Sequence, residues 1–239
     1  MLDDTTIERV LVVTAHPDDV DFGAGATIAT FTDQGISVTY CIVTDGDAGG
    51  FDPSVPRSEI PSIRRAEQTK AAELLGVHDV RFLGYRDGEL TVSHDLRRDI
   101  SRVIRQVRPQ RMLIQSPERN WERVQASHPD HLAAGEAAMQ SLYPDARNPF
   151  AHPSLLDDEG LEAWSVPEVW VMAGPNPNHF VDGTDQFARK VAALRAHESQ
   201  TGHMDELTEM LQSWMTLTAE RGSLPKGRLA EMFQVVATA

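Results

Sequence analysis

The apolar run Val10–Val13 constrains the fold of this chain most, because it is continuous rather than alternating in hydrophobicity. A continuous run of β-branched and aliphatic residues is typical of a strand that is covered on both faces. Such strands lie in the middle of parallel sheets, with helices above and below them. The pattern therefore predicts a central strand over residues 9–14 and an α/β protein built around it.

Strand and helix patterns alternate along the rest of the chain. This alternation favours an open, mostly parallel, Rossmann-like sheet with helices on both faces and a C-terminal helical tail. A chain of 239 residues fits one domain spanning residues 1–239. Further strands are predicted over residues 37–43, 80–83, 111–115, 168–173 and 179–181, and helices over residues 22–31, 62–75, 95–107, 129–142, 186–199, 205–219 and 224–236.

Composition excludes several classes of function. The chain carries 22 Lys and Arg residues against 36 Asp and Glu residues, a net charge of −14, so it would repel nucleic acids and anionic membranes. Its one cysteine, Cys41, can form no internal disulfide, which is compatible with a reducing compartment. The start of the chain is acidic where a signal peptide would be basic, and no apolar stretch reaches the ~18 residues of a membrane span. We expect a soluble, cytoplasmic protein.

Two histidine motifs stand at the ends of predicted strands. The motif Ala15-His16-Pro17-Asp18-Asp19 follows the central strand, and His128-Pro129-Asp130-His131 precedes a predicted helix more than 100 residues later. In open α/β sheets, ligands bind at the carboxyl ends of the strands. The parallel sheet is therefore expected to bring these two turns together.

The spacing within each turn suits a metal site. His16 and Asp19 are three positions apart, as are His128 and His131, which places the side chains on one side of a turn. Two imidazoles and one carboxylate with an open fourth position are typical of a hydrolytic zinc site. The additional carboxylate of Asp18 could take a proton from a water that the metal activates.

One histidine of the second turn is left over in this scheme. If His131 is a ligand, a protonated His128 can stabilise an oxyanion and protonate a leaving amine, with Asp130 available to orient it. Each turn taken alone has a structural explanation, as an Asp-capped turn or as a helix N-terminus. Together they gather several carboxylates at one edge of the sheet, and such a concentration of negative charge favours a bound cation.

The paired motif resembles the LmbE-like, or PIG-L, zinc-dependent N-deacetylases, whose members include the deacetylase and the amidase of the mycothiol pathway. The resemblance covers roughly residues 10–200. It implies zinc, or another divalent metal, as the cofactor, and a small N-acylated sugar as the substrate. Supporting segments are Thr44-Asp45-Gly46, Arg64-Arg65-Ala66-Glu67, Leu75-Gly76-Val77 and His197-Glu198-Ser199-Gln200.

The resemblance also assigns roles to individual residues. It implies metal ligands at His16, Asp19 and His131, a general base at Asp18, an acid or electrophile at His128 and a substrate-facing arginine at Arg64. Two positions depart from the family pattern. Val20 replaces a common glutamate, and Ala126 replaces a tyrosine of the mycothiol deacetylase, which weakens the match to that enzyme.

The sequence thus predicts a metal-dependent hydrolase that removes an acyl group, most simply acetyl, from an amino sugar or its conjugate. Asp45 could accept hydrogen bonds from sugar hydroxyls, although it is by default a turn former. The alternatives are an amidase acting on a thiol conjugate and a non-catalytic metal-binding module. Asp18 argues against the module, because a structural zinc site needs no extra carboxylate. The helical tail is available to pack against a second subunit.

Overall fold

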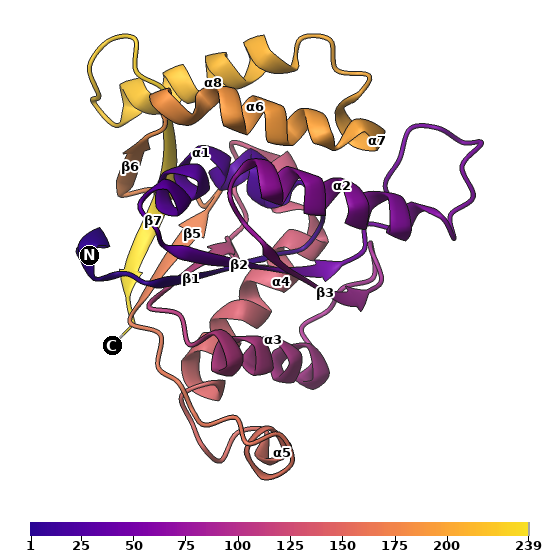
Figure 1. Cartoon of the computed structure of the whole chain (residues 1–239), viewed down its shortest axis with the longest axis vertical. Coiled ribbons are helices and arrows are strands. Elements are labelled where there is room, and N and C mark those ends of the chain that lie inside the picture. The colour runs from indigo at the N-terminus through magenta and orange to yellow at the C-terminus, as the bar shows by residue number, and fades with distance from the viewer. Residues whose placement is uncertain (239) are drawn as a thin grey trace.

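The computed structural model describes residues 1–238 and contains a seven-stranded sheet with the order β3-β2-β1-β4-β5-β7-β6 (Figure 1). Neighbouring strands among β1 to β5 pair in parallel, whereas β7 runs antiparallel to β5 and to β6. The predicted α/β class with a mostly parallel sheet is therefore confirmed. The strands are β1 Arg9–Thr14, β2 Ser37–Thr44, β3 Asp79–Tyr85, β4 Arg111–Gln115, β5 Glu168–Met172, β6 His179–Asp182 and β7 Ala230–Ala237.

Helices cover both faces of the sheet. Figure 1 shows α1, α2, α6 and α8 on one side and α3 and α4 on the other. The helices are α1 Asp19–Asp33, α2 Ile60–Leu74, α3 His94–Val107, α4 Pro129–Gln140, α5 Pro153–Asp157, α6 Phe187–Ala196, α7 Glu198–Thr201 and α8 Leu207–Arg221, with short helical turns η1 Asp4–Thr6, η2 Val124–Ser127, η3 Ser141–Asp145 and η4 Thr184–Gln186.

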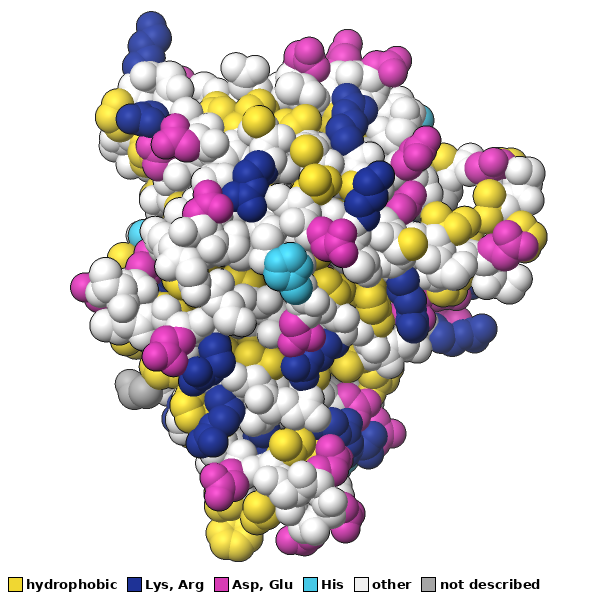
Figure 2. Space-filling model, viewed as in Figure 1, with side chains coloured by type: hydrophobic (Ala, Val, Ile, Leu, Met, Phe, Trp, Pro, Cys, Tyr) yellow, Lys and Arg dark blue, Asp and Glu magenta, His cyan; other side chains and the backbone are white. Residues whose placement is uncertain are grey.

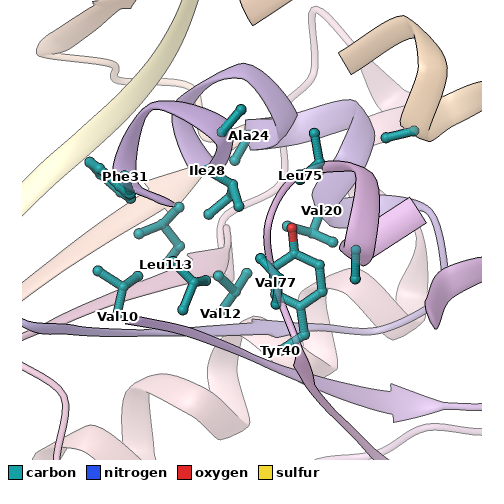
Figure 3. Packing of buried hydrophobic residues seen from close by; sticks show 14 of the residues in the cluster. Val10, Val12, Val20, Ala24, Ile28, Phe31, Tyr40, Leu75, Val77 and Leu113 are labelled. Carbon is teal, nitrogen blue, oxygen red and sulfur yellow. The ribbon is translucent and has the colours of Figure 1, made fainter. Parts of the chain in front are cut away.

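Strand β1 supplies side chains to both layers of the core. Val10 and Val12 pack among residues of α1 and α2 (Figure 3), whereas Leu11 and Val13 pack on the opposite face against α3 and α4. All four side chains are fully buried. Successive residues of a strand point to opposite faces, so a strand covered on both sides needs apolar residues at every position. This explains the continuous apolar run.

The end of the chain differs from the prediction. Helix α8 agrees with the predicted helix over residues 205–219, but the predicted helix over residues 224–236 is wrong, because β7 occupies Ala230–Ala237. Phe233 of β7 packs on the Trp170 ring in one core layer, and Val236 packs against the other layer. β7 lies between β5 and β6, so burial on both faces of the sheet outweighs the local helical pattern.

Acidic and basic side chains are interspersed on the face shown in Figure 2. Within the described part of the chain, none of the helices has the length and apolar character needed to cross a membrane.

Candidate active site

The turn after β1 presents two carboxylates in a fixed arrangement. Asp18 has a positive φ of 88°, a conformation that costs a non-glycine residue about 1–3 kcal/mol. Three side chains hold it there. The amide of Asp18 donates to Gln68 Oε1 (2.8 Å), its carboxylate accepts from Arg64 (3.0 Å), and the next carboxylate, Asp19, accepts from the His16 amide (2.7 Å).

The turn after β4 begins helix α4. Pro129 occupies the first helical position, and His128 caps the helix because its Nδ1 accepts a hydrogen bond from the Asp130 amide (3.2 Å). A close approach of α4 to β4 brings this turn over the sheet. Gly135 makes that approach feasible, since a Cβ at this position would overlap the backbone carbonyl of Gln115.

Three of the predicted site residues converge on one point. His16 Nδ1 and His131 Nε2 lie 3.2 Å apart, although their residues are 115 positions apart in the chain. The carboxylate of Asp19 lies 3.4 Å from His16 Nδ1 and 3.0 Å from His131 Nε2. Two ring nitrogens and one carboxylate facing each other form a donor set that suits zinc and related divalent ions.

The carboxylate of Asp19 and the two histidines shift one another's pKa values. Burial by itself would raise the pKa of Asp19, but the neighbouring His131 and His16 outweigh it and hold that pKa well below its usual range. Burial would lower the pKa of His131, yet attraction to Asp19 raises it. The cluster therefore balances its carboxylate with positive charge, which a divalent cation would supply in place of protons.

Two further carboxylates lie against the outer nitrogen of His16. Its Nε2 is 3.0 Å from Asp87 Oδ1 and 3.2 Å from Asp130 Oδ2. Asp130 is itself fixed, since its carboxylate accepts hydrogen bonds from the amides of Gly88 (2.7 Å) and Leu90 (3.3 Å). Histidine ligands commonly donate their second N–H to a carboxylate, which fixes the ring and its tautomer.

This arrangement corrects the expected role of Asp130. The sequence suggests that its carboxylate orients His128, but the carboxylate contacts His16, and only the backbone amide of Asp130 contacts His128. Asp87 was missed altogether. The available signal was its position two residues after β3 and just before Gly88, whose φ of 82° marks a tight turn at the carboxyl edge of the sheet.

Arg64 is buried, with 4% of its surface exposed, and it faces the first turn. Its guanidinium donates to the carbonyls of Pro17 (2.6 Å) and Gly46 (3.2 Å) and to the carboxylate of Asp18 (3.0 Å). Gly46 has a φ of 63°, and a Cβ there would overlap the guanidinium. The contacts of Arg64 thus differ from the expectation of a substrate-facing arginine, since they hold the turn in place.

Asp45 lies beside a polar cavity at the ends of β2 and β3. Its carboxylate makes two hydrogen bonds with Arg65 (2.9 and 2.6 Å). The cavity has a volume of about 410 Å³, and Asp45, Asp47 and Arg57 are among the residues that line it. Asp45, which is predicted to accept hydrogen bonds from sugar hydroxyls, therefore borders a cavity, and in this structure its carboxylate is paired with Arg65.

A buried polar chain leads from the Asp18 turn to the C-terminal half of the molecule. His197 Nε2 lies 2.8 Å from Asp21, and Asp21 also accepts from the side-chain amide of Gln68 (2.9 Å), whose oxygen holds Asp18. His197 is thus a packed histidine with no exposed surface. Val20, which replaces the glutamate common in the family, packs in the apolar core and offers no polar group to the site.

Comparison with known proteins identifies relatives over nearly the whole chain. A curated diacetylchitobiose deacetylase from Thermococcus kodakarensis is 33% identical over 96% of this chain and 84% of its own length. A probable N-acetyl-alpha-D-glucosaminyl L-malate deacetylase 2 from Bacillus cereus is 35% identical over 84% of this chain and 87% of its own length. The crystal structure of N,N'-diacetylchitobiose deacetylase from Pyrococcus horikoshii matches with a TM-score of 0.88 and 32% identity, over 98% of this chain and 85% of that chain.

The family comparison agrees with these relatives. The model described as PIG-L, GlcNAc-PI de-N-acetylase, matches residues 11–142, which is more than half of the chain. This segment contains both histidine turns. The resemblance that the paired motif suggests is therefore confirmed, and the chain belongs to the PIG-L family.

Proposed function

We propose that this protein is a metal-dependent hydrolase that removes an N-acetyl group from an amino sugar or amino-sugar conjugate. The observation that carries the proposal is the convergence of His16 Nδ1, His131 Nε2 and the Asp19 carboxylate beside the fixed carboxylate of Asp18. The relatives support the substrate class, because their names describe deacetylases of diacetylchitobiose and of N-acetylglucosaminyl malate.

His16, Asp19 and His131 would hold the metal, and their nitrogen and oxygen donors fit zinc or a similar divalent ion. When bound, such an ion polarises an amide carbonyl and makes a water molecule more acidic. Asp87 and Asp130 would support the site through the outer nitrogen of His16.

Asp18 would accept the proton of the attacking water. Burial raises its pKa to about 6, with Arg64 opposing that rise and Asp19 adding to it. A carboxylate whose pKa lies near neutral pH is a better general base than one with an ordinary pKa. Its hydrogen bonds to Arg64 and Gln68 keep it beside the proposed ligands, and the proton it accepts is then available to the departing amine.

His128 would stabilise the negative charge that develops on the amide oxygen. Its Nδ1 already accepts a hydrogen bond from the Asp130 amide, so the proton of a neutral ring lies on Nε2. Burial lowers the pKa of His128, and repulsion from His16 and His131 lowers it further. These observations favour a neutral Nε2–H donor over the protonated histidine that the sequence suggests.

The geometry bears on the alternatives as well. A ring nitrogen of His128 also lies within 4.8 Å of ring nitrogens of His16 and His131, so the number of donors does not separate a structural zinc site from a catalytic one. The carboxylate of Asp18 beside these donors is what favours catalysis. The polar cavity that Asp45 borders supports a sugar rather than a thiol conjugate on that side of the site. A cytoplasmic location is part of the proposal, supported by the free, buried thiol of Cys41.

The test measures metal content and amine release together. The purified protein is reconstituted with zinc, and free amine is assayed on N-acetylglucosamine and N,N'-diacetylchitobiose. We expect about one metal ion per chain, and release of amine that a chelator abolishes and added zinc restores. Reconstituted protein with well under one divalent ion per chain, or with no hydrolysis of any N-acetylated sugar, would contradict the proposal.

A further inference from the structure

A second cavity, of about 290 Å³, borders two of the proposed metal ligands. Asp19 and His131 are among the residues that line it, so it reaches the candidate active site. Most of its walls come from residues outside the two histidine motifs. The cavity is lined by Phe22 of α1, Met172 of β5, and Leu211, Trp214 and Met215 of α8. We refer to it as the apolar cavity.

The charged groups at the floor of the apolar cavity are already paired. Lys190 Nζ donates to Glu231 (2.5 Å) and to the carbonyl of Phe22 (2.6 Å). Glu231 also accepts from the amides of Ala26 (3.0 Å) and Thr27 (2.7 Å). Because these two groups are paired with each other and with the backbone, they offer little attraction to a charged ligand. The other polar residues of the lining, besides the two proposed ligands, are Gln115, Arg123, Gln125 and Thr218.

The outer end of the apolar cavity is an aromatic wall. Trp214 has 42% of its surface exposed, and the Arg123 guanidinium lies 4.9 Å from the centre of its ring. An arginine held over an indole leaves the other parts of the ring available for apolar contact. Ala126, which stands where the sequence comparison expects a tyrosine, also lines this cavity and adds no hydroxyl group.

The two cavities differ in chemistry, and in the order of the strands the candidate ligands lie between them, although proposed ligands line only the apolar cavity. The polar cavity lies at the ends of β2 and β3, and the apolar cavity lies against β4, β5 and β7, with the turns after β1 and β4 between them. An N-acylated amino sugar likewise has a polar end and an apolar end. The sugar is attached to the nitrogen of the amide, and the acyl chain is attached to its carbonyl carbon. A volume of 290 Å³ is many times the roughly 30 Å³ of one water molecule, so it exceeds what an acetyl methyl group needs.

We propose that the apolar cavity is an acyl-chain subsite, and that the protein hydrolyses N-acyl amino sugars with chains of about four to eight carbons better than the N-acetyl compounds. The inference rests on the proposed function and deepens it. Water adds to the amide carbonyl, the C–N bond breaks, and the products are a medium-chain carboxylate and the free amino sugar. Trp214 is a specificity-determining residue in this scheme.

Kinetics on a chain-length series provides the first test. Hydrolysis of N-acetyl-, N-butyryl-, N-hexanoyl- and N-octanoylglucosamine is compared in the zinc-loaded protein. Each buried methylene should raise kcat/KM by roughly fourfold, mainly through KM, until the cavity is full. Trp214→Ala should reduce the ratio of octanoyl to acetyl kcat/KM at least tenfold. The matched control is Leu217→Ala, since Leu217 lies on the same helix, is 62% exposed and does not line the cavity; it should leave the ratio unchanged.

Binding to the metal-free protein provides a readout that does not depend on hydrolysis. Octanamide is a neutral analogue of the acyl amide, and its binding can be compared with that of acetamide by isothermal titration calorimetry, which does not depend on the fluorescence of Trp214. We expect octanamide to bind at least tenfold more tightly than acetamide, and Trp214→Ala, but not Leu217→Ala, to remove most of the difference.

The outcomes separate the two proposals. Hydrolysis of N-acetylglucosamine with no gain for longer acyl chains and no binding of octanamide would overturn the acyl subsite and leave the proposed function standing. A gain for octyl glycosides of N-acetylglucosamine instead of N-octanoylglucosamine would overturn it in favour of an aglycone site. Trp214-dependent binding of octanamide without hydrolysis of any amide would support the acyl subsite and overturn the proposed function.

Discussion

His16 lies between two sets of partners, with Asp87 3.0 Å from its Nε2 and His131 3.2 Å from its Nδ1. The inner nitrogen therefore faces the proposed metal ligands, and the outer nitrogen faces a carboxylate that comes from the turn after β3. An outer carboxylate makes the imidazole a better ligand and fixes its orientation. Asp87 is thus expected to act through His16 and not by contact with substrate.

Asp87→Asn should weaken zinc binding by about 10-fold to 100-fold, because the amide neither carries the negative charge nor polarises the ring to the same extent. The measurement is the zinc Kd by competition with a chelating dye. Glu89→Gln is the matched control, since Glu89 lies in the same turn with its side chain 59% exposed, and its Kd should equal that of the unmodified protein. An unchanged Kd in Asp87→Asn would show that Asp87 does not support the site, because Asp130 still contacts His16 in that variant.

Asp18→Asn should retain zinc and lose hydrolysis by about 100-fold to 10,000-fold, because asparagine cannot accept the proton of the attacking water. The amide can still accept the hydrogen bond from Arg64, so the turn should keep its conformation. Metal content and kcat are measured on the same preparation. A turnover equal to that of the unmodified protein would exclude Asp18 as the general base.

The two histidines of the second turn should behave differently when each is replaced by alanine. His131→Ala removes a nitrogen that faces His16 and Asp19, so it should lose zinc. His128→Ala removes the proposed donor to the amide oxygen and the side-chain cap of α4, but no proposed ligand, so it should keep zinc and lower kcat by about 100-fold to 1,000-fold. Zinc loss in His128→Ala with zinc retained in His131→Ala would mean that the two roles are exchanged.

The sequence predicted best those elements whose own residues show how deeply they are buried. The bounds predicted for β1 and β4 match the structure, because continuous apolar runs in the middle of a parallel sheet leave little freedom of register. β7 was predicted as helix because its partners, β5 and β6, are far away in the chain, and only pairing with them makes a strand at Ala230–Ala237 favourable.

The candidate site was predictable where a motif gathers several polar residues, as in the two histidine turns. It was not predictable where the role of a residue depends on its neighbours in space. Asp130 turns toward His16 because the amides of Gly88 and Leu90, from another turn, hold its carboxylate there. The apolar cavity involves helix α8, whose position over the site depends on its packing against β7 and α6.

Cys41 should be inert in the folded protein. Burial raises the pKa of its thiol to about 12, and its side chain has no exposed surface. Because the thiolate is the reactive form, a thiol reagent at pH 8 should label the native protein only as fast as the protein opens, and should label it at once in denaturant. Rapid and complete labelling of the native protein would contradict the burial of β2.

Arg64 should affect kcat far more than KM, because it contacts the carboxylate of Asp18 and two backbone carbonyls of the site's turns. Arg64→Met leaves Asp18 buried without its cation, so the free energy of unfolding should fall by about 3 kcal/mol, and kcat should fall because Asp18 is no longer held in place. The control is Arg65→Met, which removes the neighbouring arginine, a residue with a 45% exposed side chain that pairs with Asp45. That variant should keep kcat. A rise in KM with unchanged kcat in Arg64→Met would instead indicate direct contact of Arg64 with the sugar.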